Sequence, residues 1–201
     1  TPAPDPHIPT NPPTELSPLE DLKVVIPEPD PHDFGWSDAA GAFTIPPGGT
    51  AAVTVSASLA DGAGFGIENA LGSILEASAS GVIPPGPANL VLNGGSPTET
   101  TTAQINAYVH LTATRRFWLD RLDPFETMLD IPLLVRVNGD SNEPCNACFC
   151  WDPGLGSYIL SFAPSHLQNN GCFNAAYATI VSHEFGHFVQ RQLGFSSNDS
   201  V

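Results

Sequence analysis

Basic side chains are scarce in this sequence: six Lys and Arg stand against 21 Asp and Glu, giving a formal net charge of −15. Such a field repels phosphate backbones and anionic lipid headgroups, which excludes nucleic acid and acidic membrane surfaces as partners. Clustered carboxylates could instead hold Ca²⁺. No DxDxDG loop occurs, however, and the simpler interpretation is that the acidity keeps the protein soluble.

Long apolar runs are also missing. No stretch of about 18 apolar residues occurs, so the sequence predicts no membrane-spanning helix. The chain begins at Thr1 and has no basic or apolar region typical of a signal peptide. We therefore expect a secreted, mature product from which such a segment has been removed.

Cysteine is rare and clustered. Cys145, Cys148, Cys150 and Cys172 all lie within 28 residues. An even number of cysteines in a chain of extracellular character predicts two disulfides, with three possible connectivities. A second zinc site is the alternative, because Cys145 and Cys148 have ligand spacing. The remaining spacings match a two-plus-two zinc site poorly.

Composition divides the chain into three regions. Residues 1–31 hold ten of the 21 prolines. Because proline fixes φ and lacks an N–H, we expect an extended arm or linker there, apart from an apolar patch at 22–26. Residues 32–98 are typical of a β-rich scaffold and contain no recognisable chemistry. Residues 99–201 mix helical and strand patterns, so the predicted fold class is α+β.

The elements expected from residue patterns are short. Alternation and turn residues predict strands at 41–45, 51–59, 65–68, 73–76, 89–92, 131–137 and 157–162. Apolar residues at helical spacing predict helices at 99–122 and 174–193. Pro124 should end the first helix, and Gly194 should end the second.

The last predicted helix carries an HExxH motif, His183-Glu184-Phe-Gly-His187. Residues i and i+4 share a helix face, so both imidazoles can reach one Zn²⁺ at about 2.0–2.1 Å. Glu184 can take a proton from a zinc-bound water, whose pKa the metal lowers toward about 7. The alternative is a helix with two surface histidines and an ordinary glutamate.

Two features favour the zinc interpretation. Gly186 costs about 1 kcal/mol in a helix interior, which suggests that something approaches the helix closely there. Apolar residues flank the motif and would bury the helix in a core: Ile180, Val181, Phe188 and Val189.

Residues 99–194, about half of the chain, resemble the thermolysin/fungalysin-type gluzincins, especially secreted bacterial relatives of fungalysin. The resemblance rests on segments 103–110, 132–137, 145–147 and, most specifically, 172–187. It implies the upper lobe of a zinc metalloendopeptidase, ending on its active-site helix. Zn²⁺ would be the cofactor, and extracellular proteins or peptides the substrates.

The resemblance also implies roles for the preceding segment. In this family an Asn-Ala edge strand holds the substrate backbone, which makes Asn146 and Ala147 candidates for that contact. A disulfide-pinned loop is the alternative. A bridge from Cys172 to Cys145, Cys148 or Cys150 would then tie the edge strand to the zinc helix, and the other two cysteines would close a short loop.

The sequence departs from the family after the motif. Gluzincins take a third zinc ligand from a Glu on a later helix, but only 14 residues follow His187, and none is Glu or His. Asp199 is the remaining anionic candidate. We expect the C-terminal remainder of the same precursor to complete the site, and this chain alone to be inactive. The alternative function is an extracellular structural or adhesive protein with an inactive peptidase-like lobe.

Overall fold

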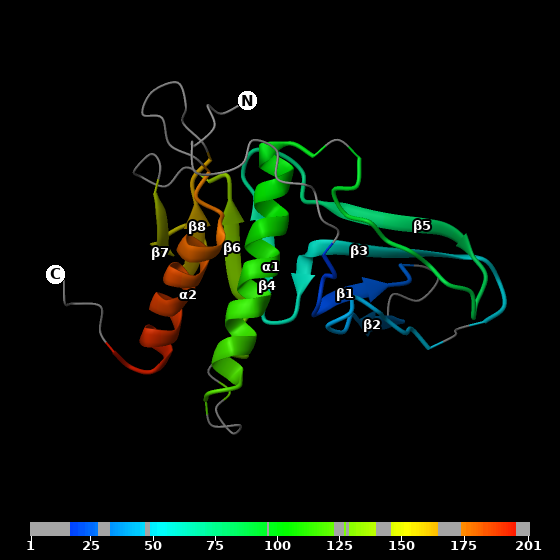
Figure 1. The fold of residues 1–201 in the computed structure, drawn as a ribbon, viewed down its shortest axis with the longest axis horizontal. Coiled ribbons are helices and arrows are strands. Elements are labelled where there is room, and N and C mark those ends of the chain that lie inside the picture. The colour runs from blue at the N-terminus through cyan, green and yellow to red at the C-terminus, as the bar shows by residue number, and fades with distance from the viewer. Residues whose placement is uncertain are drawn as a thin grey trace.

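The computed structural model describes residues 17–27, 33–46, 49–95, 97–122, 127, 129–139, 146–164 and 174–195. These ranges form eight strands and two helices, which confirms the mixed α+β class (Figure 1). In chain order the elements are β1 Leu22–Val25, β2 Phe34–Trp36, β3 Val53–Gly62, β4 Phe65–Asn69, β5 Glu76–Val82, α1 Glu99–Leu119, β6 Leu133–Val137, β7 Ala147–Asp152, β8 Ser157–Phe162 and α2 Ala178–Gln192.

One sheet runs through all three regions of the sequence. Its order is β2-β1-β3-β4-β6-β8-β7, and β5 pairs with β3 beside this path. The apolar patch of the proline-rich arm forms β1, which lies between β2 and β3. The β-rich region joins the C-terminal region where β4 pairs in parallel with β6. β7 lies at the end of the sheet, antiparallel to β8.

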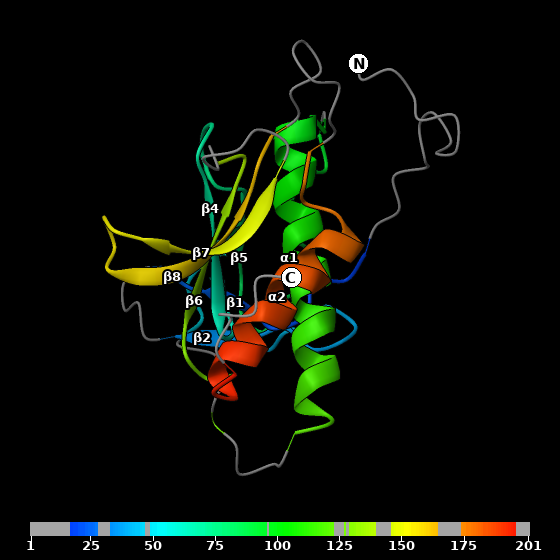
Figure 2. The same cartoon turned by 90° about the vertical axis from the view of Figure 1, so that its left-hand side faces the viewer.

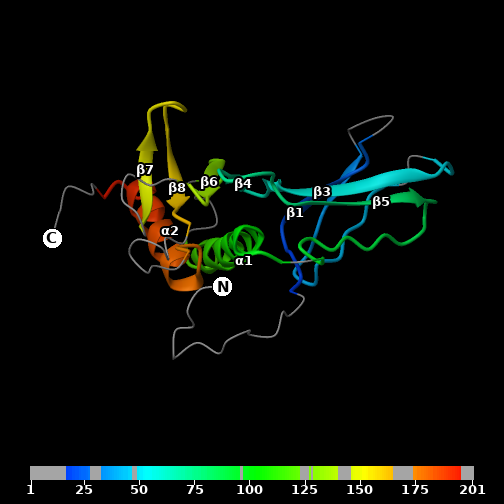
Figure 3. The ribbon, with the colours of Figure 1, turned by 90° about the horizontal axis from the view of Figure 1, so that it is seen from above.

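Both helices cover the same face of the half-sheet β4-β6-β8-β7 (Figures 2 and 3). Alternate residues of the parallel strands face the helices and are fully buried, among them Ile67, Val135 and Phe162. Burying such side chains contributes about 1.5–3 kcal/mol each. The core therefore lies between this half-sheet and the helix pair. Among the described residues no helix has both the length and the apolar character needed to cross a membrane.

Helix α1 follows the expected pattern and ends three residues early. Thr98 caps it, with Thr98 and Thr101 bonding reciprocally as a capping box. Its buried face repeats at helical spacing and includes Ala103, Ala107 and Leu111. Tyr108 is also buried, and its hydroxyl donates to the carbonyl of Glu20, which fixes the approach to β1.

The predicted strands at 41–45 and 89–92 are absent from the sheet, and only the last residue of the predicted strand 73–76 belongs to it. Residues 41–45 follow a turn in which Asp38 Oδ1 accepts from the N–H groups of Ala40 and Ala42. Residues 73–76 are held by Gln104, which bonds Ser73 O and Leu75 N, so β5 begins only at Glu76. Residues 89–92 form no ladder, although Leu90 and Leu92 pack on the core. The apolar residues of 89–92 therefore contribute to the core without forming a strand.

Strand β7 appears where no residue pattern predicted a strand. Only the resemblance indicated an edge strand, beginning at Asn146-Ala147, and the structure places β7 there. Its face opposite the helices carries an ion network in which Arg136 bonds Glu68 at 3.2 Å and Asp152 at 2.7 Å. The hydrogen bond from Arg136 holds the pKa of the Asp152 carboxyl below its usual range, against the effect of desolvation.

The buried side-chain amide of Asn138 connects β6 to β4, to α1 and to the segment before α2. Asn138 follows β6 with φ of 54° and is 2% exposed. Its Nδ2 donates to Asn69 Oδ1 at 2.9 Å and to Thr100 O at 3.1 Å. Its Oδ1 accepts from Asn174 Nδ2 at 2.8 Å. This side chain therefore ties the ends of β4 and β6 to the start of α1 and to the approach to α2.

Replacing Asn138 by Ala should lower the free energy of unfolding by about 2–4 kcal/mol, because buried partners lose their bonds. Chemical denaturation measures this loss. Asn93→Ala is the matched control, since Asn93 also has positive φ (59°) but makes no side-chain hydrogen bond within the described ranges. Equal losses in the two variants would assign the effect to backbone conformation instead.

A second, larger pocket lies away from the HExxH helix. It measures about 1370 Å³ and lies between β1, β3, residues 84–95 and α1. Its lining is mainly apolar, and His110 is the one titratable side chain among the lining residues that the structure describes. Partial burial lowers the pKa of this histidine, which favours its neutral form.

Candidate metal and catalytic site

The HExxH motif lies on α2, as predicted. Val181, Phe185, Phe188 and Val189 form the buried face of this helix. His183 is exposed and His187 half-buried on the other side. Helix α2 begins at Ala178, four residues later than predicted. Its N-cap residue, Tyr177, makes no side-chain capping hydrogen bond. Gly194 has φ of 79°, which confirms the predicted stop.

The two imidazoles converge on one point. His183 Nε2 and His187 Nε2 lie 3.1 Å apart. A tetrahedral zinc with Zn–N bonds of about 2.05 Å would separate its two nitrogens by about 3.3 Å. The ring Nδ1 of His187 lies 3.3 Å from Gln190 Oε1. A proton on Nδ1, donated to Gln190, leaves Nε2 free as a ligand. The pair therefore fits one shared zinc ion.

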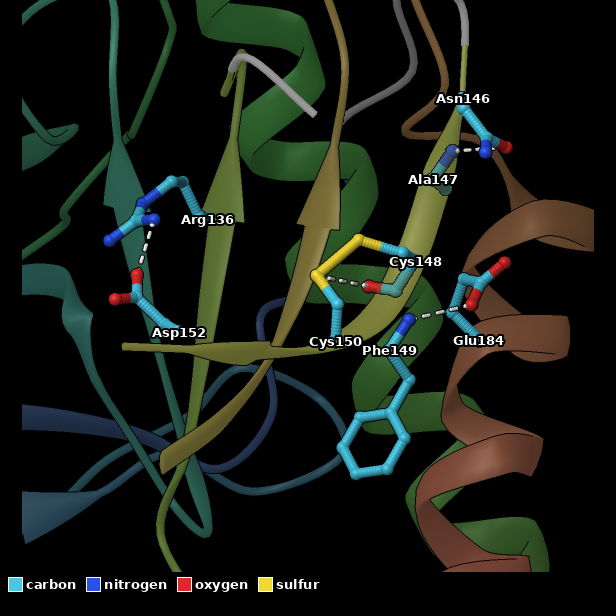
Figure 4. Close-up of a disulfide and its surroundings, with 8 residues drawn as sticks. All are labelled: Arg136, Asn146, Ala147, Cys148, Phe149, Cys150, Asp152 and Glu184. Carbon is cyan, nitrogen blue, oxygen red and sulfur yellow. Dashed lines mark hydrogen bonds and ion pairs between the residues drawn. A yellow bond between two sulfur atoms is a disulfide. The ribbon is translucent and has the colours of Figure 1, made fainter. Parts of the chain in front are cut away.

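Glu184 lies between α2 and the edge strand. The side chain is 8% exposed. Its Oε2 accepts a hydrogen bond from the backbone N–H of Phe149 at 2.8 Å (Figure 4). Its other oxygen has no hydrogen-bond partner among the described residues. The carboxylate is thus held by one oxygen, while the second remains available to a ligand.

A pocket brings the predicted residues together. It measures about 380 Å³ and is lined by Asn146, Ala147, Thr179, Ile180, His183 and Glu184. The two residues proposed to hold substrate therefore share one pocket with a candidate zinc ligand and the candidate base. Thr179 and Ile180 complete its lining.

Outward-facing groups of β7 border this pocket. Asn146 O accepts from Ala163 N, and Asp152 O accepts from Gly156 N. The direction of backbone hydrogen bonding alternates along a strand. The N–H and C=O groups of even-numbered residues of β7 therefore point toward β8, and those of Ala147 and Phe149 point away from β8. The N–H of Ala147 is satisfied by Asn146 Oδ1 at 2.9 Å. The Ala147 carbonyl faces out as an acceptor.

The cysteines are resolved in part. Cys148 and Cys150 form a disulfide on β7. The predicted pairing joined Cys172 to one of the other three cysteines and left the remaining two to close a short loop. The Cys148–Cys150 bond agrees with such a loop. Cys145 and Cys172 lie outside the described residues, as does Asp199.

The remaining two cysteines should pair with each other. A Cys145–Cys172 bridge would close a loop of 27 residues and, in the chain-entropy model, stabilise the fold by on the order of 3 kcal/mol. Peptide mapping without reduction should recover one peptide pair joined through Cys145 and Cys172. Free thiols at both positions, or a bound second metal, would contradict this pairing.

One interpretation from the sequence needs revision, and two others stay predictions. A Cβ added to Gly186 would meet no atom within 4 Å, so nothing in the described part of the chain requires close approach there. No group of three or more His, Cys, Asp or Glu converges within the described ranges. The third zinc ligand and the Ca²⁺ site thus remain predictions.

Residue patterns missed two contributors to the site. Phe149 supplies the N–H that holds Glu184, and Gln190 lies beside the ring of His187. Gln190 could have been found from its i+3 spacing to His187 on a helix. Phe149 gave no local signal, because its partner is 35 residues away.

Comparisons with known proteins add no assignment: no family model, no curated protein and no solved structure matches the chain.

Proposed function

We propose that this chain is part of a zinc-dependent endopeptidase related to the gluzincins, and that α2 is its active-site helix. One observation carries the proposal. The Nε2 atoms of His183 and His187 meet at 3.1 Å beside a pocket that Glu184 shares with the edge strand β7. Two unrelated surface histidines would not be expected to lie beside a pocket that holds Glu184 and residues at the edge strand.

His183 and His187 would hold the zinc ion. When bound, zinc polarises a substrate carbonyl and makes a neighbouring water more acidic. The bond between His187 and Gln190 orients one imidazole and selects the tautomer that coordinates through Nε2.

Glu184 acts as the general base and then as the general acid. Its free oxygen takes a proton from the attacking water as the water oxygen bonds to the scissile carbonyl carbon. The same carboxyl then gives that proton to the amide nitrogen as the C–N bond breaks. The bond from Phe149 N–H to Oε2 restricts the orientation of the carboxylate.

Strand β7 orients the substrate. The outward carbonyl of Ala147 accepts an N–H from an extended peptide, with Asn146 beside it at the same edge of the pocket. In this arrangement the peptide lies along β7 with its scissile bond near Glu184. Secretion, an upper-lobe role for the C-terminal half, and completion by a C-terminal remainder of the precursor belong to the same proposal.

Cleavage of an unfolded protein tests the function. The precursor form that contains this chain should cleave such a substrate, lose activity when zinc is chelated, and regain it when zinc is restored. A zinc-binding protein that cleaves nothing under any of these conditions would favour the structural or adhesive alternative.

A further inference from the structure

The edge strand and the HExxH helix are joined at one hydrogen-bonded point in the part of the chain that the structure describes. Phe149 N–H donates to Glu184 Oε2 across the gap between β7 and α2. Neighbouring residues of β7 direct their N–H groups to β8 instead, as the alternation of the antiparallel pair requires. This N–H therefore holds one oxygen of the Glu184 carboxylate against β7.

Phe149 is held from the helix side of the sheet. Its ring stacks on Tyr158 with centroids 5.1 Å apart and meets the edge of Phe188 at 5.9 Å. The guanidinium of Arg191 covers Tyr158 at 3.8 Å from the ring centroid. These contacts fix the side chain but leave the backbone dihedrals on either side of Phe149 to the strand itself.

The Cys148–Cys150 disulfide adds a covalent restraint to the backbone that the ladder with β8 holds. Successive side chains of a strand alternate between faces, so the two cysteines lie opposite the ring of Phe149. Their bond closes a small ring whose backbone contains Phe149 (Figure 4). The residue that anchors Glu184 is thus confined on both faces of the sheet.

We propose that the disulfide-closed segment Cys148–Cys150 is a positioning element for Glu184. Pairing with β8 turns the Phe149 N–H toward α2. The closed ring restricts the dihedrals around it, and opening the ring would loosen its bond to the carboxylate without removing β7 from the sheet. This inference rests on the proposed function for its catalytic meaning, while its structural part stands on the Phe149–Glu184 bond alone.

Amide hydrogen exchange in the zinc-free chain tests the structural part. In the double variant Cys148→Ser/Cys150→Ser, the Phe149 amide should exchange at least about tenfold faster, the scale of a lost bond to a charged acceptor. The amides at positions 148 and 150, which bond β8, should stay protected. Unchanged exchange at Phe149 would overturn the proposal. Equal acceleration of all three amides would do so as well, because the disulfide would then only keep β7 paired.

Glu184→Ala supplies the matched variant. It removes the acceptor, so Phe149 exchange should rise as in the serine variant, and combining the two changes should add no further increase. Fully additive effects would show that the disulfide and Glu184 act separately and would contradict the proposal.

Activity separates this inference from the proposed function. In the precursor form, the serine variant should lower kcat with little change in KM, since the carboxylate is misplaced while β7 still binds substrate. Absence of peptidase activity together with the expected exchange would reject the function and leave the positioning role intact. The reverse result would reject the positioning role alone.

Discussion

In the precursor form, replacing Glu184 by Gln should lower kcat/KM for peptide cleavage by about 10²–10⁴-fold, the usual scale for loss of a general base. The amide keeps an oxygen that can accept from Phe149 N–H, so the side chain should stay in place beside β7. It lacks the basicity to take a proton from water. Zinc content should remain unchanged, because the imidazole pair is untouched. Steady-state kinetics and elemental analysis of the same preparation measure both quantities.

Glu76→Gln is the matched control for this variant. Glu76 is an exposed glutamate at the start of β5, in the other half of the sheet. The same chemical change there should leave cleavage unaltered. Retained activity in Glu184→Gln would move the proton-transfer role to another residue, and loss of zinc would mean that Glu184 supports the metal site instead.

Local patterns predicted the helices well because their information is local. The α2 segment has apolar residues at helical spacing and glycine at its end, and the structure places Val181, Phe185 and Phe188 inside. The convergence of His183 and His187 follows from the i, i+4 spacing alone. The metal-binding part of the candidate site was therefore predictable from one segment of sequence.

Strand pairing was less predictable because it depends on distant partners. Residues 73–76 were predicted as a strand, yet the buried amide of Gln104 holds them as a connection. β7 was missed by pattern because its residues ACFCWD show no alternation of polar and apolar types. This segment is a strand because it pairs with β8, and its own residue pattern does not indicate that pairing.

The contact between β7 and α2 illustrates the same limit at the site. Nothing near Glu184 in sequence indicates that a backbone N–H will anchor it, and nothing near Asn138 beyond a turn signal indicates a buried amide with three bonds. Both sets of hydrogen bonds join residues that are far apart in the sequence. The sequence predicted candidate residues for the chemistry, whereas the groups that contact these residues became apparent only in the fold.

Replacing His187 by Ala should weaken zinc binding by more than about 100-fold. Groups that only orient a metal ligand typically contribute about 10–100-fold to affinity, so removing a ligand should exceed that range. Gln190→Ala, which removes only the acceptor beside His187 Nδ1, should fall within it. Gly186→Ala lies on the same helical turn, meets no atom within 4 Å, and should leave affinity unchanged while stabilising the helix by up to about 1 kcal/mol. Competition with a zinc-responsive chelator, with the cysteines kept oxidised, measures all three. Equal zinc affinity in the wild type and His187→Ala would place the metal elsewhere and remove the observation on which the proposed peptidase rests.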